Sequence, residues 1–567
     1  MHLRPRFAAV MTILAGLLAA PAVRAQAAKA SPARPVVSAA EKKAAEEINA
    51  ARLRSHIRFL SSDLLEGRGP ATRGDLLTRS YIAAVLEGEG LEPAGPGGSW
   101  FQPFDIVGVT TKAPAVTTFV KGADKLDLKF SDDYVAVDND QQPQVALSNA
   151  EVVFVGYGIQ APEFQWDDFK GTDLKGKVLL IMNNDPEDDP ALFAGKTRLY
   201  YGRWDYKYDS AARQGAAGAI IIHTTPSAGY GWNVIQSSWT GEQSYLPLEG
   251  APHVLVKSWV TEDAARKLAR LGGQDLDALR AAAQKRDFKP VPLGVTWNVA
   301  LSADVQKKQT ANVLGRLPGR DPVLGKQVVL YSAHHDHLGM REAKTPGEDV
   351  IYNGAHDNAT GVAAVLSIMR AMKALPQRPA RSVVFALVAA EEQGLLGSKY
   401  FAAHPTMAPG LIAADINIDG INTIGRTRDL TMVGMGKSSL DTTIKQLTGM
   451  QGRTLVPDQF PDRGFFYRSD QFPLARIGVP AAYFDAGTDV IGKPAGYGKQ
   501  QVEEFEAKHY HQPSDELTPD WVWEGGVEDV QLFFYLGAKV ANDPKLPAWN
   551  AGDEFEAARK AALAAVK

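Results

Sequence analysis

Apolar runs and helical patterns alternate along the C-terminal half of the chain. Residues 328–331 and 383–388 are continuous apolar runs typical of buried strands, and a helical pattern follows Gly361 between them. This alternation predicts an α/β fold in which a mostly parallel, mixed sheet carries helices on both faces. Open sheets of this kind bind ligands at the carboxyl ends of their strands.

Helical patterns are also expected near both ends of the chain. Ser38 and Glu41 have the spacing of a capping box before an amphipathic helix, and a second helix is predicted over residues 72–86. The Ala-rich and charged residues 554–567 are typical of a surface helix.

The segment from about residue 149 to residue 290 has a β-rich pattern. Short β-branched runs such as 152–155 and 178–181 are separated by Gly and Asp, and residues 211–222 have the pattern of a helix end, a glycine turn and a buried strand. This segment resembles the protease-associated domain, a β-rich insert found in several peptidase families. An unrelated small α/β module is the alternative interpretation.

The first residues have the pattern of a cleavable secretion signal. Arg4 and Arg6 precede an apolar run over residues 7–20, and cleavage is expected after Ala25. The run is shorter than the roughly 20 residues that cross a bilayer. We therefore expect an exported protein, periplasmic or secreted, that is not stably inserted in a membrane once the signal is cleaved.

Composition narrows the function classes and the available ligands. Hydrophobic residues make up 45% and charged residues 22% of the chain, which is typical of globular proteins, and the net charge of -4 favours no nucleic-acid partner. The chain has no cysteine, so a metal site must use His and carboxylate ligands. The patterns together predict a signal peptide (1–25), a flexible spacer (26–37), the N-terminal part of a catalytic domain (38–140), the insert (141–290), the rest of the catalytic domain (291–548) and a tail (549–567).

Metal-competent side chains follow the apolar runs of the last domain. A single histidine or acidic pair is usually an ordinary surface or core residue. Here such residues recur at successive strand ends, which meet at one edge of a parallel sheet and therefore indicate a shared site. The residues are His334, Asp336, His356, Asp357, Glu391, Glu392 and Asp419, with Tyr510, His511 and Asp515 farther along the chain.

The order and spacing of these motifs resemble the two-zinc exopeptidases, a family that includes bacterial leucine aminopeptidases, glutamate carboxypeptidase and the transferrin receptor. The motifs are residues 333–336, 354–361, 391–398, 417–419 and 510–515, and residues 57–68 resemble the leading helix region of the family. The resemblance implies that Asp357 bridges two zinc ions, that Glu392 and His511 complete one of them, and that His334 and Asp419 complete the other. Three carboxylates and one hydroxide would balance the charge of two Zn²⁺. Mixed nitrogen and oxygen ligands also suit zinc better than calcium or magnesium.

The resemblance implies further roles beside the ligands. Glu391 would be the general base, and Tyr510 would donate a hydrogen bond to the oxyanion of the reaction intermediate. Asp336 is expected to accept a hydrogen bond from the free ring nitrogen of His334, and Asp515 to play a similar supporting part.

Two positions depart from the family pattern, and three further histidines leave the identity of the histidine ligands open. His356 stands where an acidic residue is frequent and is expected to fill space or to bond near the site, whereas the role of Gln471, where His is frequent, stays open. His335, His337 and His509 are spare histidines, and the ligand set would shift if one of them replaced a named ligand.

The sequence therefore predicts a zinc-dependent aminopeptidase that removes N-terminal residues from peptides. A carboxypeptidase of the same fold is the alternative, with Arg463, Arg468 or Arg476 as a clamp for the terminal carboxylate. An inactive, receptor-like homologue is a third interpretation, which the intact ligand set disfavours. A one-zinc glutaminyl cyclase is a fourth, which the insert disfavours. The oligomeric state stays open.

Overall fold

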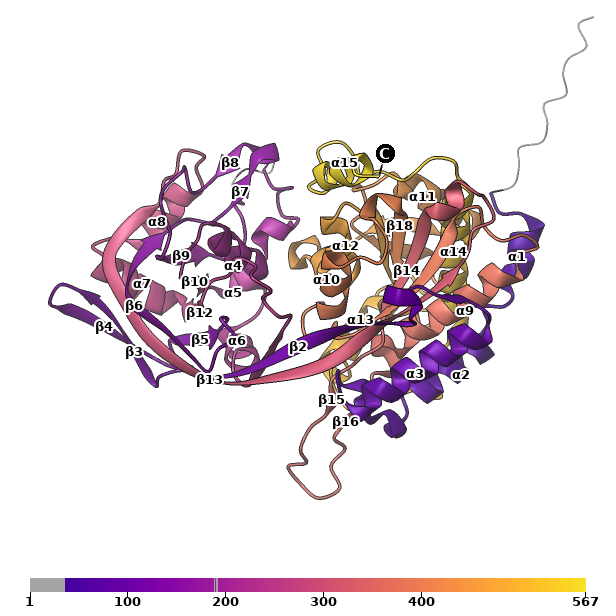
Figure 1. Cartoon of the computed structure of the whole chain (residues 1–567), viewed down its shortest axis with the longest axis horizontal. Helices are drawn as coiled ribbons and strands as arrows, with labels where there is room; N and C mark the ends of the chain where they lie inside the picture. Colours follow the sequence, from indigo (N-terminus) through magenta and orange to yellow (C-terminus); the bar gives the residue numbers. More distant parts are fainter. Residues whose placement is uncertain (1–35, 188, 190–191, 567) are drawn as a thin grey trace, which may run out of the picture. The chain divides into compact units, whose positions relative to one another are not determined.

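The computed structural model describes residues 36–187, 189 and 192–566 (Figure 1). The predicted signal peptide and most of the predicted spacer lie outside these residues. None of the helices in the described ranges is long and apolar enough to cross a membrane.

The C-terminal sheet is built around four parallel strands. Their spatial order is β17 (Ser382–Val388), β14 (Val328–His334), β18 (Ile412–Asn417) and β21 (Ala481–Asp485). β13 (Val291–Leu317) pairs antiparallel with β17 on one side. On the other side β19 (Asp429–Val433) pairs antiparallel with β21 and parallel with β20 (Thr454–Pro457). The predicted mixed, mostly parallel sheet is confirmed.

Helices cover both faces of this sheet. Successive strand residues point to opposite faces, so Val329 and Tyr331 of β14 join one core while Val328 and Leu330 join another. The first core includes residues of α2 (Ala50–Leu60), α9 (Thr360–Ala374) and α14 (Trp523–Asn542), and the second includes residues of α10 (Leu396–Ala403) and α12 (Gln471–Arg476). Burial on both faces explains why these strands are apolar without interruption.

The predicted terminal helices are present. α1 (Ala39–Ala45) begins at the complete capping box of Ser38 and Glu41, and α3 (Arg73–Gly88) begins after Thr72, whose side chain caps it. α15 (Glu556–Ala564) forms the tail helix. Its Arg559 is buried and donates to the carbonyl of Ile412 at 2.8 Å, so the helix is fixed to the sheet.

The segment predicted to be β-rich forms the remaining part of the large sheet. β6 (Gln144–Phe154), β9 (Val178–Met182), β10 (Gly218–His223) and β12 (Val256–Thr261) are parallel neighbours, and α4 (Trp204–Arg213) precedes β10 as expected. β5 (Tyr134–Asp138) pairs with β12, and the hairpin of β3 (Val116–Lys121) and β4 (Asp124–Lys129) pairs with β13 through β3. All three strands precede the predicted boundary at residue 141, but β3 and β5 pair with strands beyond it. The boundary and the likeness to a protease-associated domain stay predictions.

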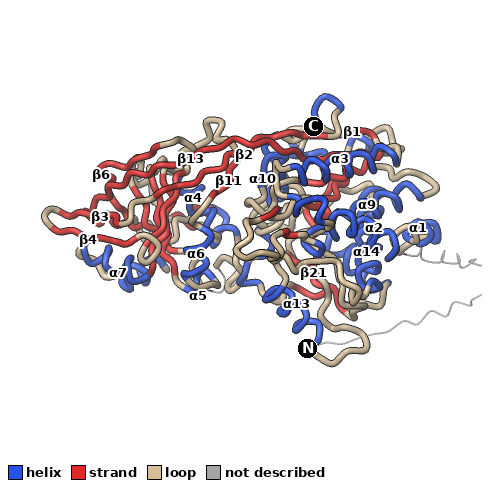
Figure 2. The backbone as a smooth tube through the Cα atoms, turned by 90° about the horizontal axis from the view of Figure 1, so that it is seen from below, coloured by secondary structure: helices blue, strands red, loops and turns tan. Residues whose placement is uncertain are grey.

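One long strand belongs to both parts of the sheet. β13 pairs with β6 near its start, with β2 (Phe101–Lys112) in its second half and with β17 at its end (Figures 1 and 2). The backbone is therefore continuous from the insert to the strands that carry the predicted ligands. The other described helices and strands are β1 (Glu92–Pro93), β7 (Gln160–Ala161), β8 (Trp166–Asp167), α5 (Thr225–Ala228), α6 (Trp232–Ser238), β11 (Glu242–Tyr245), α7 (Glu262–Leu271), α8 (Leu276–Ala283), β15 (Gly339–Met340), β16 (Ile351–Tyr352), α11 (Leu440–Met450) and α13 (Tyr497–Lys508).

Candidate metal centre

The predicted ligands come from three neighbouring strand ends and two loops. His334 is the last residue of β14, Glu392 follows β17, and Asp419 follows β18. Because these strands are parallel neighbours, their carboxyl ends lie at one edge of the sheet. Asp357 lies in the turn before α9, and His511 lies in the loop after α13.

The five side chains meet around Asp357. His334 Nε2 lies 3.3 Å from Asp357 Oδ1 and 3.1 Å from Asp419 Oδ1. His511 Nε2 lies 3.2 Å from Asp357 Oδ2 and 3.0 Å from Glu392 Oε2. Each oxygen of Asp357 thus faces a different histidine, which is the arrangement a bridging carboxylate requires.

These distances fit metal ligation. Two donors that each lie about 2.1 Å from one tetrahedral zinc are separated by about 3.3 Å, and the four nitrogen–oxygen separations are 3.0 to 3.3 Å. His511 Nε2 is shielded from solvent, and its contacts with the carboxylates of Asp357 and Glu392 do not have the angles of a regular hydrogen bond. Donor atoms of His334, Asp357 and Asp419 also gather closely enough to hold an ion. The residues therefore fit a pair of metal ions.

Glu391 lies beside this cluster with a free carboxylate. A carboxylate oxygen of Glu391 lies within 4.8 Å of donor atoms of His334 and Glu392. Burial raises the pKa of Glu391 well above its usual range, and the negative charges of Asp419 and Glu392 add to this shift against the opposing effect of His334. Without bound metal, the Glu391 carboxyl therefore holds its proton to a higher pH than an ordinary glutamate does.

Tyr510 also adjoins the cluster. Its ring stacks on the ring of His511 at a centroid distance of 3.8 Å, and 42% of the residue is exposed. Burial of the hydroxyl, together with the charges of Asp357 and Glu392, raises the pKa of Tyr510. The hydroxyl therefore keeps its proton at neutral pH and can donate a hydrogen bond.

Asp336 supports the cluster differently from the prediction. The Nδ1 of His334 lies 3.3 Å from the main-chain oxygen of Asp336 but 3.8 Å from its carboxylate, so the main chain, not the carboxylate, is its hydrogen-bond partner. The carboxylate of Asp336 instead accepts from the backbone N–H groups of Glu391 at 3.2 Å and Glu392 at 3.4 Å. Asp336 thus holds the loop after β17 in place.

Asp515 supports the other side of the cluster. Its carboxylate accepts from the backbone N–H groups of His356 at 2.9 Å and Asp357 at 3.0 Å. The ring of His356 packs against Phe505 at a centroid distance of 4.6 Å. His356 therefore fills space between the turn and α13. Gln471 is buried in hydrogen bonds with Asn417 and the carbonyl of Phe466.

Two of the spare histidines take no part in the cluster. His335 is buried and its Nε2 lies 3.3 Å from the carbonyl of Ala311, while half-buried His509 contacts Ser514. The remaining one, His337, does contact a predicted ligand, with its Nδ1 2.6 Å from Glu392 Oε1.

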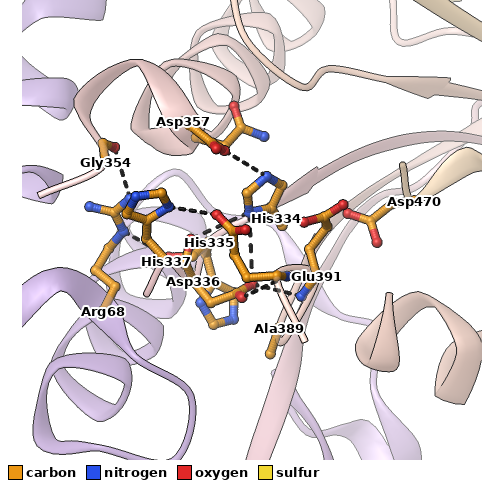
Figure 3. A network of polar contacts seen from close by, with 12 residues as sticks. Arg68, His334, His335, Asp336, His337, Gly354, Asp357, Ala389, Glu391 and Asp470 are labelled. Atoms are coloured by element: carbon orange, nitrogen blue, oxygen red, sulfur yellow. Dashed lines mark hydrogen bonds and ion pairs between the residues drawn. The ribbon is translucent and has the colours of Figure 1, made fainter. Parts of the chain in front are cut away.

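Arg68 holds the segments that carry predicted ligands, a role that local sequence patterns did not predict. Its buried guanidinium donates to the carbonyls of His335 at 2.9 Å, Asn353 at 2.6 Å and Gly354 at 2.9 Å, and Figure 3 shows it beside the two ligand segments. Every residue has a main-chain oxygen, so the types of the accepting residues do not indicate these bonds. The resemblance of residues 57–68 to the family was the available signal.

Comparison with known protein sequences gives partial matches. Residues 312–532 match the model of Peptidase family M28. Leupeptin-inactivating enzyme 1 of Streptomyces exfoliatus is 28% identical over 211 residues, which are 36% of this chain and 43% of that protein. A probable zinc metalloprotease of Pyricularia oryzae is 34% identical over 112 residues, which are 20% of each chain. The matched part thus spans less than half the length of these relatives.

Solved structures with a similar arrangement include two bacterial aminopeptidases. The aminopeptidase from Aneurinibacillus sp. strain AM-1 is 20% identical with a TM-score of 0.45, covering 89% of this chain and 97% of that one. BSAP, a zinc aminopeptidase from Bacillus subtilis, is 18% identical with a TM-score of 0.40, covering 90% of this chain and 99% of that one. The strand-end motifs lie within residues 312–532, the part of the chain that is similar to peptidase family M28.

Proposed function

We propose that this protein is an exported aminopeptidase that uses two zinc ions per chain to remove N-terminal residues from peptides. One observation carries the proposal: two histidines and three carboxylates from distant segments converge at the separations expected of co-ligands, with a free Glu391 beside them. The match of residues 312–532 to peptidase family M28 supports a peptidase reaction.

In this proposal His334 and Asp419 hold one zinc ion, Glu392 and His511 hold the other, and Asp357 contacts both. Nitrogen and carboxylate ligands without cysteine suit zinc. Bound zinc would act as a Lewis acid on the scissile carbonyl and would lower the pKa of attacking water.

The protein's own groups then handle the proton and the charge of the reaction. The Glu391 carboxylate takes a proton from water and returns it to the leaving amine, since it lies beside the ligands. The Tyr510 hydroxyl donates a hydrogen bond to the oxygen on which negative charge develops.

The substrate class is tested with paired substrates. Aminoacyl p-nitroanilides with a free amine, and N-acetylated peptides with a free carboxyl end, are incubated in parallel with the purified protein, before and after chelation and after zinc is restored. We expect zinc-dependent cleavage of the free-amine compounds alone. Cleavage of N-blocked peptides from the carboxyl end would instead select the carboxypeptidase alternative, and inactivity of zinc-loaded protein on both classes would select a receptor-like role.

Export is proposed from residues 1–25 alone. The test is the N-terminal sequence of the protein recovered from the periplasm or medium of a Gram-negative expression host. We expect it to begin at Gln26, and uncleaved protein retained in the cytoplasm would contradict export.

A further inference from the structure

A buried histidine outside the predicted ligand set contacts one of the ligands. His337 has no exposed surface, and its Nδ1 lies 2.6 Å from Glu392 Oε1. The other oxygen of the same carboxylate, Glu392 Oε2, lies 3.0 Å from His511 Nε2. The two oxygens of Glu392 therefore face two different histidines.

Two features fix the place of the His337 ring. The backbone N–H of His337 donates to the carbonyl of Arg68 at 3.3 Å. The ring packs directly on Gly354, where an added Cβ would lie 2.6 Å from the ring Cγ, and Gly354 also has a φ of +54°. Only glycine leaves room for the ring at this contact. Figure 3 shows His337 beside Gly354 and Arg68.

The short distance distinguishes hydrogen bonding from co-ligation. Two ligands of one tetrahedral zinc lie about 3.3 Å apart, and the separations among the predicted ligands are 3.0 to 3.3 Å. Donor atoms of His337, Asp357 and Glu392 also lie within reach of a common ion. The 2.6 Å between His337 Nδ1 and Glu392 Oε1 is nevertheless shorter than the separation of co-ligands and suits a hydrogen bond to a carboxylate.

We propose that His337 is a positioning residue, whose Nδ1–H holds Glu392 Oε1 so that Oε2 alone is presented together with His511 and Asp357. Without this bond the carboxylate could turn about its terminal torsion, and ordering it would then cost part of the metal-binding free energy. The inference rests on the proposed metal centre and adds to it a residue that acts on only one of the two ions.

A matched pair of substitutions tests the role of Nδ1. The amide nitrogen of Asn can stand close to the place of Nδ1, whereas that of Gln stands closer to the place of Nε2. His337→Asn therefore retains a donor for Glu392, while His337→Gln moves it away. His335→Gln is the control, because His335 is an equally buried neighbour that bonds the carbonyl of Ala311 through Nε2.

The measurement is the affinity of each zinc ion, obtained by chelator competition on the full-length mature protein, with circular dichroism of the metal-free form to verify folding. We expect His337→Gln to weaken one ion about 10- to 100-fold and leave the other unchanged, with His337→Asn within about threefold of wild type. The control should bind both ions as wild type does. Wild-type affinities in His337→Gln, or equal losses in the Asn and Gln variants, would overturn the inference. If wild-type protein bound no zinc, the proposed function itself would fail.

Discussion

The hydroxyl of Ser469 donates a hydrogen bond to Asp419 Oδ2 at 2.7 Å, while Asp419 Oδ1 lies 3.1 Å from His334 Nε2. Ser469 in turn accepts from Asn417 Nδ2 at 2.8 Å, and all these groups except Asp419 are buried. The carboxylates of Asp419 and Glu392 are thus arranged in the same way. In each of them, one oxygen is held by a protein donor and the other oxygen faces a predicted histidine ligand.

Ser469→Ala removes the donor to Asp419 and is expected to weaken the zinc ion held by His334 and Asp419 about 10- to 100-fold. Chelator competition measures the change. Ser367→Ala is the control, because Ser367 is a buried serine that bonds only the carbonyl of Ala363 in its own helix. Equal zinc affinities in Ser469→Ala and wild type would contradict a supporting role for Ser469.

Glu391→Gln keeps the shape of the side chain and removes its ability to carry a proton. We expect kcat to fall by about 10²- to 10⁴-fold, because proton transfer is lost, while zinc content stays that of wild type. Steady-state kinetics and elemental analysis on one preparation give both values. If turnover stayed at the wild-type level, another group would have to be the base.

Tyr510→Phe removes a hydroxyl that faces the cluster from a half-exposed ring. The expected result is a fall in kcat of about 10²-fold with little change in KM, because the bond forms only as charge develops on the oxyanion. Tyr497→Phe, at the start of α13, serves as the control tyrosine. A rise in KM at constant kcat would show instead that Tyr510 binds the ground state.

His56 should make folding weaker in acid. It is a buried residue of α2 whose Nδ1 lies 2.7 Å from the hydroxyl of Tyr81 in α3, and burial lowers its pKa from 6.5 to about 4. Between these values the unfolded chain binds a proton that the folded chain does not, so the free energy of unfolding falls as pH falls from 6.5 towards 4.

His56→Asn removes the ionisable ring and therefore this loss of unfolding free energy in acid, which amounts to about 3 kcal/mol when complete. Urea unfolding at pH 7 and at pH 4.5 measures the difference for wild type and variant. The variant should lose less stability on acidification, whereas the exposed control His404→Asn should match wild type. Identical losses in all three proteins would show that His56 titrates normally.

Local patterns made much of the fold predictable. The capping box at Ser38 and the apolar runs of β14 and β17 depend on neighbours in the sequence or on burial on both faces, and both signals are visible in one chain. The ligand candidates followed from their positions after these strands and from the family resemblance.

Other features depend on contacts between distant residues and left no local signal. Ser469 reaches Asp419 across 50 residues, and His337 reaches Glu392 across 55, so neither bond could be derived from spacing. His334 Nδ1 bonds the main-chain oxygen of Asp336, not its carboxylate, for a related reason: the main-chain oxygen lies closer to the ring nitrogen. Strand pairing also places β5 beside β12, beyond the predicted boundary.

The most direct test of the central claim is the zinc content of the purified protein after dialysis against metal-free buffer, measured by inductively coupled plasma mass spectrometry in wild type and in Asp357→Ala. Because Asp357 is the only predicted ligand shared by both ions, we expect about two zinc ions per wild-type chain and a loss of zinc from both sites in the variant. Folded wild-type protein that binds no zinc after zinc is supplied, or an Asp357→Ala variant that retains both ions, would contradict the account.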